Sequence, residues 1–211
     1  MFTSTFSERV KIRDLRTRAE LGGGTLYDIS IYCINAARYL FRAEPIEVLA
    51  CSVNATRQRL PNVDESTPAI LKFDGGRVAL FVSFNPADVG AYEIVGTKGH
   101  LRVDPAYETR KDWRTNLQSA ITPLRGKHAS ATNLRPSSFT FQTAFSQEPE
   151  PSGEEGLQDV RIIRALYESA ETHKPVEIPP YQPLKRPTRR QRIDRPAVEM
   201  PALVATRSPT E

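Results

Sequence analysis

The stretch "PAILKFDGGRVALFVSFN" (residues 68–85) decides the fold of this chain. Its centre, Asp74-Gly75-Gly76, is a strong turn signal between two apolar runs, because glycine tolerates the backbone angles of tight hairpin turns. Apolar side chains then alternate along the second run, which is the two-residue period of a strand. Since a hairpin joins antiparallel strands, the stretch predicts antiparallel sheet.

Strand signals continue on both sides of this hairpin. "AYEIVGTKGHLRVD" (91–104) reads as a second hairpin that turns between Gly96 and Gly99, and "IEVLACSVN" (46–54) reads as a strand. A further short strand is predicted within residues 1–12. An antiparallel sheet with helices kept apart from it in the sequence is typical of the α+β class, which is the fold class we predict.

Two amphipathic helices are predicted. The first lies within "GGGTLYDISIYCINAARYL" (22–40) and ends near Phe41. Its apolar residues at helical spacing are Ile29, Tyr32, Cys33, Ala36, Ala37 and Leu40. The second lies between Ser152, a plausible N-cap, and Pro175. Its predicted buried face consists of Leu157, Val160, Ile163 with Ile162, Leu166 and Tyr167.

Composition and charge narrow the class of protein. The chain has 211 residues, enough for one ordinary domain, and no apolar run approaches the roughly 20 residues that cross a bilayer. The N-terminus lacks the apolar segment of a signal peptide, so we predict a cytoplasmic protein with no membrane partner. The net charge of +4 lies entirely from Lys174 onward. This tail has one aromatic residue, Tyr181, which favours a solvated segment over a nucleic-acid-binding surface.

Two segments depart from globular patterning. Residues 109–147 contain eleven Ser/Thr and one acidic residue, Asp112, and fit neither period, as in a divergent or out-of-frame segment. We therefore predict one domain over 1–183, with 109–147 atypical and poorly ordered, and a flexible Pro/Arg-rich tail over 184–211. The two cysteines, Cys33 and Cys51, are predicted to be buried free thiols, and no metal site is predicted.

The glycines at 22–24 have two interpretations. A phosphate-binding loop must follow a buried strand, but the preceding "LRTRAEL" (15–21) is no strand, and the spacing matches neither GxGxxG nor GxxxxGK[ST]. The favoured interpretation is that the glycines let the chain pass close to another group and then begin a helix.

The helix that follows carries polar side chains on one side. At about 100° per residue, Asp28, Tyr32, Asn35 and Tyr39 fall within an arc of about 60°. A carboxylate and a phenol at i, i+4 could exchange a proton with a substrate hydroxyl or carbonyl. The alternative is purely structural, with Asp28 favoured by the helix dipole and Tyr32 lying at the rim of the core.

Three stretches resemble one enzyme family. "ELGGGTLYDISIYCINAARYLFRAEPIEV" (20–48) is similar to the start of the substrate domain of glucose–fructose oxidoreductase-type enzymes, in the Gfo/Idh/MocA family. "DVGAYEIVGTKGHLRVDPAYE" (88–108) resembles that domain's later strands. "EPEPSGEEGLQDVRIIRALYESAETHKPVEIP" (148–179) resembles its closing helix and strand. The resemblance implies an open, mostly antiparallel sheet with helices packed on one face, preceded in the family by a Rossmann domain.

The resemblance also implies site residues. Asp28 and Tyr32 match the family's catalytic Asp and Tyr, with Tyr32 taking a sugar hydroxyl proton and Asp28 orienting it. Gly23, Gly24 and Asn35 are the expected substrate-binding residues. The implied cofactor is NAD(P), the implied substrate is a sugar, and the open sheet face implies a homo-oligomer.

One departure from the family limits the functional expectation. No GxGxxG and no Glu-Lys-Pro motif occurs in these residues, so the Rossmann domain is expected to be absent and no cofactor-binding residue is assigned. The expected function is a truncated NAD(P)-dependent sugar oxidoreductase, a substrate-binding and oligomerisation domain that is inactive alone. The alternative is a non-catalytic interaction or ligand-binding module that pairs with related subunits.

Overall fold

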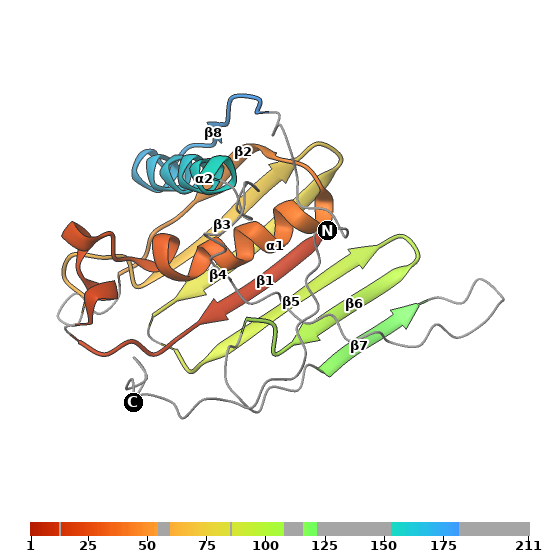
Figure 1. Cartoon of the computed structure of the whole chain (residues 1–211), viewed down its shortest axis with the longest axis horizontal. Helices are drawn as coiled ribbons and strands as arrows, with labels where there is room; N and C mark the ends of the chain where they lie inside the picture. Colours follow the sequence, from red (N-terminus) through yellow and green to blue (C-terminus); the bar gives the residue numbers. More distant parts are fainter. Residues whose placement is uncertain (13, 55–59, 85, 108–115, 122–152, 182–211) are drawn as a thin grey trace, which may run out of the picture.

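The architecture is an eight-stranded sheet with two α-helices on one face (Figure 1). The computed structural model describes residues 1–12, 14–54, 60–84, 86–107, 116–121 and 153–181. Strands follow the order β7-β6-β5-β1-β4-β3-β2-β8 across the sheet. Helices α1 and α2 lie over the β1–β2 half, while no helix of the described residues covers β5, β6 and β7 (Figure 1). The α+β fold is confirmed.

The sheet is mostly antiparallel, as predicted. Its strands are β1 (Phe2–Ser7), β2 (Pro45–Ala50), β3 (Ser66–Phe73), β4 (Gly76–Ser83), β5 (Val89–Gly96), β6 (Gly99–Asp104), β7 (Asn116–Ile121) and β8 (Val176–Glu177). Among the described strands the one parallel pair is β1 with β4, which places the N-terminal strand between the two hairpins. The chain's first residues thus join two hairpins that the sequence predicts separately.

Both predicted hairpins are present. In the first, Phe73 pairs with Gly76, and Gly75 has a φ of +70°, which suits glycine. In the second, Gly96 pairs with Gly99. The alternating residues of β4 and the position after it are buried, as their period predicts: Val78, Leu80, Val82 and Phe84.

The first helix begins with an irregular turn. Two 3-10 turns, η1 (Leu15–Thr17) and η2 (Ala19–Leu21), precede a π-helical turn, η3 (Leu26–Ser30), and α1 spans Ile31–Phe41. A π-turn is wider than an α-turn, so it changes the phase between residues before and after it. The predicted apolar stripe is therefore partly wrong, because Tyr32 is 48% exposed and Leu40 is also exposed, whereas Ile34 and Arg38 are buried.

The second helix, α2, spans Gly153–Thr172, and its predicted buried face is confirmed at Ile162, Ile163 and Leu166 but wrong nearer its start. Leu157 is 59% exposed and Val160 is also exposed, while Glu155 and Asp159 are buried. Those two carboxylates pair with the buried Arg38 of α1, and this pairing sets which side of α2 faces inward. The predicted N-cap, residue 152, lies outside the described residues.

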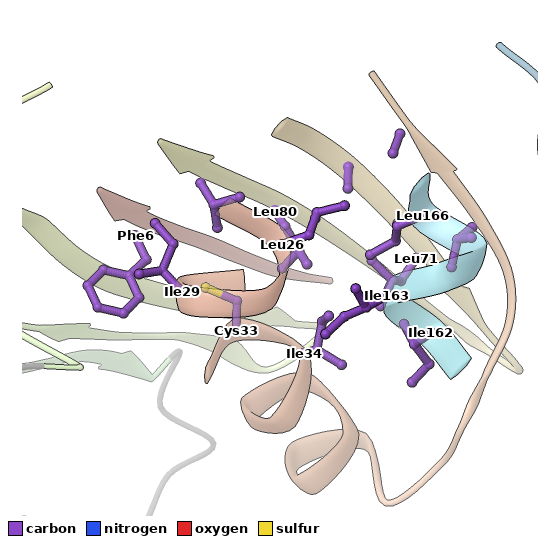
Figure 2. Packing of buried hydrophobic residues seen from close by; sticks show 14 of the residues in the cluster. Phe6, Leu26, Ile29, Cys33, Ile34, Leu71, Leu80, Ile162, Ile163 and Leu166 are labelled. Atoms are coloured by element: carbon purple, nitrogen blue, oxygen red, sulfur yellow. The ribbon is translucent and has the colours of Figure 1, made fainter. Parts of the chain in front are cut away.

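One hydrophobic core joins the two helices to the sheet (Figure 2). The first helical segment contributes Leu26, Ile29, Cys33 and Ile34, and the sheet contributes Leu71 and Leu80. From α2 come Ile162, Ile163 and Leu166. Because each fully buried aliphatic side chain contributes about 1.5–3 kcal/mol, this cluster fixes α1 and α2 against the sheet.

Several predictions about the rest of the chain can also be compared with the structure. Cys33 is buried, but Cys51 is exposed, because β2 ends one residue earlier at Ala50. Within 109–147 the structure describes residues 116–121, which form the edge strand β7. The remainder of that segment and the tail 184–211 lie outside the described residues. In the part of the chain that is described, no helix has the length and apolar character to cross a membrane.

Candidate functional site

Asp28 and Tyr32 lie at the start of the first helical segment. Asp28 belongs to the π-turn η3, and Tyr32 belongs to the first turn of α1. Tyr32 is 48% exposed, and the Asp28 side chain is 23% exposed. Among the described residues no hydrogen bond joins the two side chains. The phenol is therefore accessible from solvent, and the carboxylate is partly buried one helical turn before it.

The partner of Asp28 is an arginine that the sequence analysis did not consider. Arg16 Nε lies 2.8 Å from Asp28 Oδ2, and Asp14 Oδ1 in turn lies 3.4 Å from Arg16 Nη1. Burial raises the pKa of the Asp28 carboxyl above its ordinary value, while the Arg16 cation opposes that shift. Arg16 lies in the η1 turn, where neither charge nor period marks it as a partner of the helix.

The Tyr32 ring is held by an aromatic cluster. It meets Phe6 of β1 edge-on, with ring centroids 5.7 Å apart, and Tyr107 lies 6.5 Å away. Tyr107 stacks on Phe6 at 5.1 Å, and its hydroxyl lies 2.7 Å from the Ser4 hydroxyl. Burial raises the pKa of the Tyr107 phenol, so Tyr107 stays protonated and lies beside Tyr32 as an uncharged aromatic side chain.

The glycines of the turn at 22–24 pass close to other atoms of the protein itself. A β-carbon at Gly23 would lie 2.4 Å from the Arg16 carbonyl oxygen. A β-carbon at Gly24 would lie 2.7 Å from Tyr167 Oη and 2.8 Å from Asp64 Oδ1, and Gly24 has a φ of +118°. Both glycines thus make room for the protein's own atoms. Their assignment as substrate-binding residues stays a prediction.

Asp64 anchors this turn from the loop before β3. Its carboxylate accepts hydrogen bonds from the Thr25 backbone N–H (3.1 Å) and from the Thr25 hydroxyl. It also accepts from the hydroxyls of Thr67 on β3 (2.7 Å) and Tyr167 on α2 (3.1 Å). One carboxylate therefore ties the start of the helix to the sheet and to α2. A single acidic residue in a loop carries no periodic signal by which the sequence could reveal this role.

The same contacts test whether the glycine turn fits the phosphates of a dinucleotide. The N–H groups of Gly23 and Gly24 donate to the carbonyls of Arg18 and Arg16, each at 2.9 Å. The next N–H, that of Thr25, donates to the Asp64 carboxylate. The donors that would cradle a phosphate are used within the protein, and a negative charge faces the helix start. The residues of this turn do not fit a dinucleotide phosphate.

Asn35 lies in a different cluster from Asp28 and Tyr32. Its Oδ1 accepts a hydrogen bond from Arg38 Nη1 at 3.3 Å. The buried Arg38 guanidinium also pairs with Glu44 (2.7 Å), Glu155 (2.8 Å) and Asp159 (2.6 Å). Asn35 therefore lies at the contact between α1 and α2, and the predicted grouping of Asn35 with Asp28 and Tyr32 is wrong. Its substrate-binding role stays a prediction that these contacts do not support.

The fold and site agree with a known class of protein. Residues 5–178 match the profile of an oxidoreductase family's C-terminal alpha/beta domain. That class agrees with the mixed sheet and the helices on one of its faces. The chain belongs to the Gfo/Idh/MocA oxidoreductase family.

Individual relatives are sugar-acting enzymes by name. The chain is 30% identical over 183 residues to D-xylose 1-dehydrogenase (NADP(+)) 2 of Haloferax volcanii, covering 83% of this chain and 55% of the relative. It is 28% identical over 167 residues to D-xylose 1-dehydrogenase [NADP(+)] of Haloarcula marismortui, covering 77% and 46%. The chain thus spans about half the length of these relatives.

A solved structure confirms the fold. Aldose-aldose oxidoreductase from Caulobacter crescentus, complexed with glycerol, is similar with a TM-score of 0.67 and 23% sequence identity. The similarity covers 84% of this chain and 55% of that structure. At this identity the likeness supports the architecture of the sheet and helices alone.

Proposed function

We propose that this chain is the substrate side of an NAD(P)-dependent sugar oxidoreductase and that Asp28 and Tyr32 carry its proton chemistry. The observation that carries the proposal is an exposed phenol one helical turn after a partly buried carboxylate, in a chain of this family. The names of the xylose dehydrogenases support a sugar as substrate and NADP as cofactor.

The proposed chemistry divides between this chain and a cofactor. Oxidation of a sugar alcohol removes a hydride from carbon and a proton from the hydroxyl. A nicotinamide supplied from outside these 211 residues would accept the hydride. Tyr32 Oη takes the hydroxyl proton while the phenol passes its own proton toward the negative Asp28 carboxylate, which also orients the phenol. Phe6 and Tyr107 contact the Tyr32 ring and would help to orient it. The 211 residues alone are expected to be inactive.

The open face of the sheet supports the proposal of a homo-oligomer. Leu49 of β2 and Ile70 of β3 are paired in register and are 39% and 49% exposed. Their neighbours along the strands, Val48 and Leu71, are buried on the helix side, so Leu49 and Ile70 point to the opposite face. An apolar pair of this kind on a sheet face suits burial against a second copy.

The test is to fuse an intact family dinucleotide domain ahead of Met1 and measure sugar-dependent reduction of NADP. The unfused chain should show none. In the fusion, Tyr32→Phe should lower kcat by about 10²- to 10⁴-fold, the usual contribution of a general acid–base group. Asp28→Asn should lower it less, because Asp28 acts through Tyr32. The matched control is Tyr39→Phe, which removes an exposed phenol further along α1. An active fusion that is indifferent to Tyr32→Phe contradicts the assignment.

A second candidate function rests on the exposed apolar pair of the sheet. With Leu49 and Ile70 exposed on the open face, the chain could pair with a related full-length subunit as a non-catalytic module. This alternative predicts stable co-purification with such a subunit and no turnover in the fusion. The catalytic proposal predicts turnover that depends on Tyr32.

A further inference from the structure

We propose that Arg16 is a positioning residue for the candidate reaction, holding the Asp28 carboxylate in place ahead of Tyr32. This role of Arg16 rests on the proposed function, because only that function makes Asp28 a catalytic group. The geometric part of the proposal, a fixed and charged Arg16–Asp28 pair, does not depend on turnover. The two parts therefore have separate tests.

The side chains of Arg16 and Asp28 are held together at close range. Arg16 Nε lies 2.8 Å from Asp28 Oδ2, and the two side chains are 30% and 23% exposed. Arg16 is itself fixed, because Asp14 Oδ1 accepts its backbone N–H at 3.0 Å and lies 3.4 Å from Nη1. An arginine held at its own backbone and guanidinium loses less conformational freedom when it binds a carboxylate than a flexible surface cation does.

The backbones of the two residues are also linked, through Gly24. The Gly24 N–H donates to the Arg16 carbonyl at 2.9 Å, and the Asp28 N–H donates to the Gly24 carbonyl at 3.2 Å. The absent side chain of Gly23 completes the arrangement, because a β-carbon there would collide with the Arg16 carbonyl oxygen. Arg16 and Asp28 thus form a closed ring of contacts through backbone and side chains. The η1 turn and the start of the helix cannot shift independently.

The charged groups around the pair set the sign of the expected effect. Asp28 is influenced by the cation of Arg16 and by the more distant carboxylate of Asp14, while Glu8 also acts on Arg16. Burial and Asp14 favour the neutral form of Asp28, and Arg16 favours the charged form. Removal of Arg16 deletes the influence that favours the charged form of Asp28. The pKa of Asp28 must then rise, and the carboxylate becomes less able to polarise Tyr32 at neutral pH.

The test is an NMR titration of the Asp28 side-chain carboxyl ¹³C signal in the full 211-residue chain. We expect Arg16→Gln to raise the midpoint by about one pH unit or more, the effect of losing an adjacent opposite charge. Arg16→Lys should restore most of the difference, and Arg18→Gln, a neighbouring exposed arginine, should leave the midpoint unchanged. An unchanged midpoint in Arg16→Gln overturns the proposal.

A second measurement covers the case in which Arg16→Gln fails to fold. In the unsubstituted chain, the Arg16 Nε–H should exchange with water at least about tenfold more slowly than the Arg18 Nε–H, because Arg16 Nε is buried 2.8 Å from Asp28 Oδ2. Asp28→Asn should remove that protection. Equal exchange of the two arginines in the unsubstituted chain overturns the proposal. If the pair behaves as expected but the fusion enzyme shows no turnover, the proposed function fails while the pair stands.

Discussion

The carboxylate of Asp64 lies against the position where Gly24 would carry a side chain. Asp64 Oδ1 is 2.8 Å from the site of a β-carbon on Gly24, and Tyr167 Oη is 2.7 Å from the same site. A loop before β3 and a residue of α2 therefore require a glycine at the start of the helix. The glycine is present for a contact within the protein, and that contact places the turn that carries Asp28.

The first prediction compares two glycines of the same turn. Gly22→Ala should lower the free energy of unfolding by about 1–2 kcal/mol, because Gly22 has a left-handed φ of +79° but open space around it. Gly24→Ala should cost about 2 kcal/mol more, since its methyl group must displace Asp64 and Tyr167 as well. Urea denaturation of both variants measures the difference. Equal losses would show that only backbone conformation matters at Gly24.

The second prediction concerns the Asp64 carboxylate. Asp64→Asn places an amide N–H₂ or a single carbonyl where four donors from Thr25, Thr67 and Tyr167 converge. We expect a loss of about 2–3 kcal/mol in the free energy of unfolding, because at least one buried donor is left unpaired. Asp74→Asn, at the exposed hairpin turn, should change it by less than about 0.5 kcal/mol. Stability to urea is the measurement, and similar values for both variants would contradict the anchoring role.

The third prediction concerns the buried guanidinium of Arg38. Arg38→Met removes the cation that pairs with Glu44, Glu155 and Asp159 and leaves three carboxylates together. The loss should be about 3–5 kcal/mol, as for other buried ion pairs from which one partner is removed. Arg164→Met, on the exposed side of α2, is the matched control and should have little effect. A thermal or urea transition that Arg38→Met leaves unchanged would show that the cluster adds nothing to stability.

The fourth prediction distinguishes the two cysteines. Cys51 is exposed, whereas Cys33 is buried and its burial raises the thiol pKa to about 11. Only the thiolate reacts with a disulfide reagent, so at pH 8 the folded chain should react rapidly at Cys51 alone. The buried Cys33 thiol is protonated at pH 8 and should react only on unfolding. The number of protein thiols that react with the reagent, with and without urea, checks this prediction. Two thiols per chain that react rapidly in the folded protein would contradict it.

The fifth prediction addresses the open face of the sheet. Ile70→Lys puts a charge beside Leu49 on that face without touching the helix side. If the face joins two copies, the variant should become monomeric at concentrations where the unsubstituted chain is oligomeric, because an unpaired charge cannot be buried cheaply. Light scattering measures the mass. Lys72→Gln, a polar change on the same strand, is the control, and an unchanged mass in Ile70→Lys would remove the proposed interface.

Much of the sheet could be predicted from the sequence because its signals are local. The turn at Asp74-Gly75-Gly76 and the alternation through Val82 lie within a few residues of one another, and backbone hydrogen bonds between neighbouring strands follow from them. The spacing of Asp28 and Tyr32 is local too, so the sequence could place them one helical turn apart.

Tertiary structure decided what those residues touch. The buried Arg38 pairs with Glu155 and Asp159, so these residues face inward and Leu157 faces solvent. Asp64 and Arg16 contact the turn that carries Asp28 and hold it in place. The sequence alone determined an α+β sheet and a carboxylate–phenol pair, because periodicity reports which backbone hydrogen bonds form nearby. The inward face of α2 depends on Arg38 meeting Asp159 and Glu155, which lie 121 and 117 residues away along the chain, beyond any local window of sequence. The partner of Asp28 is nearer in sequence, but Arg16 lies in a turn whose conformation no period predicts.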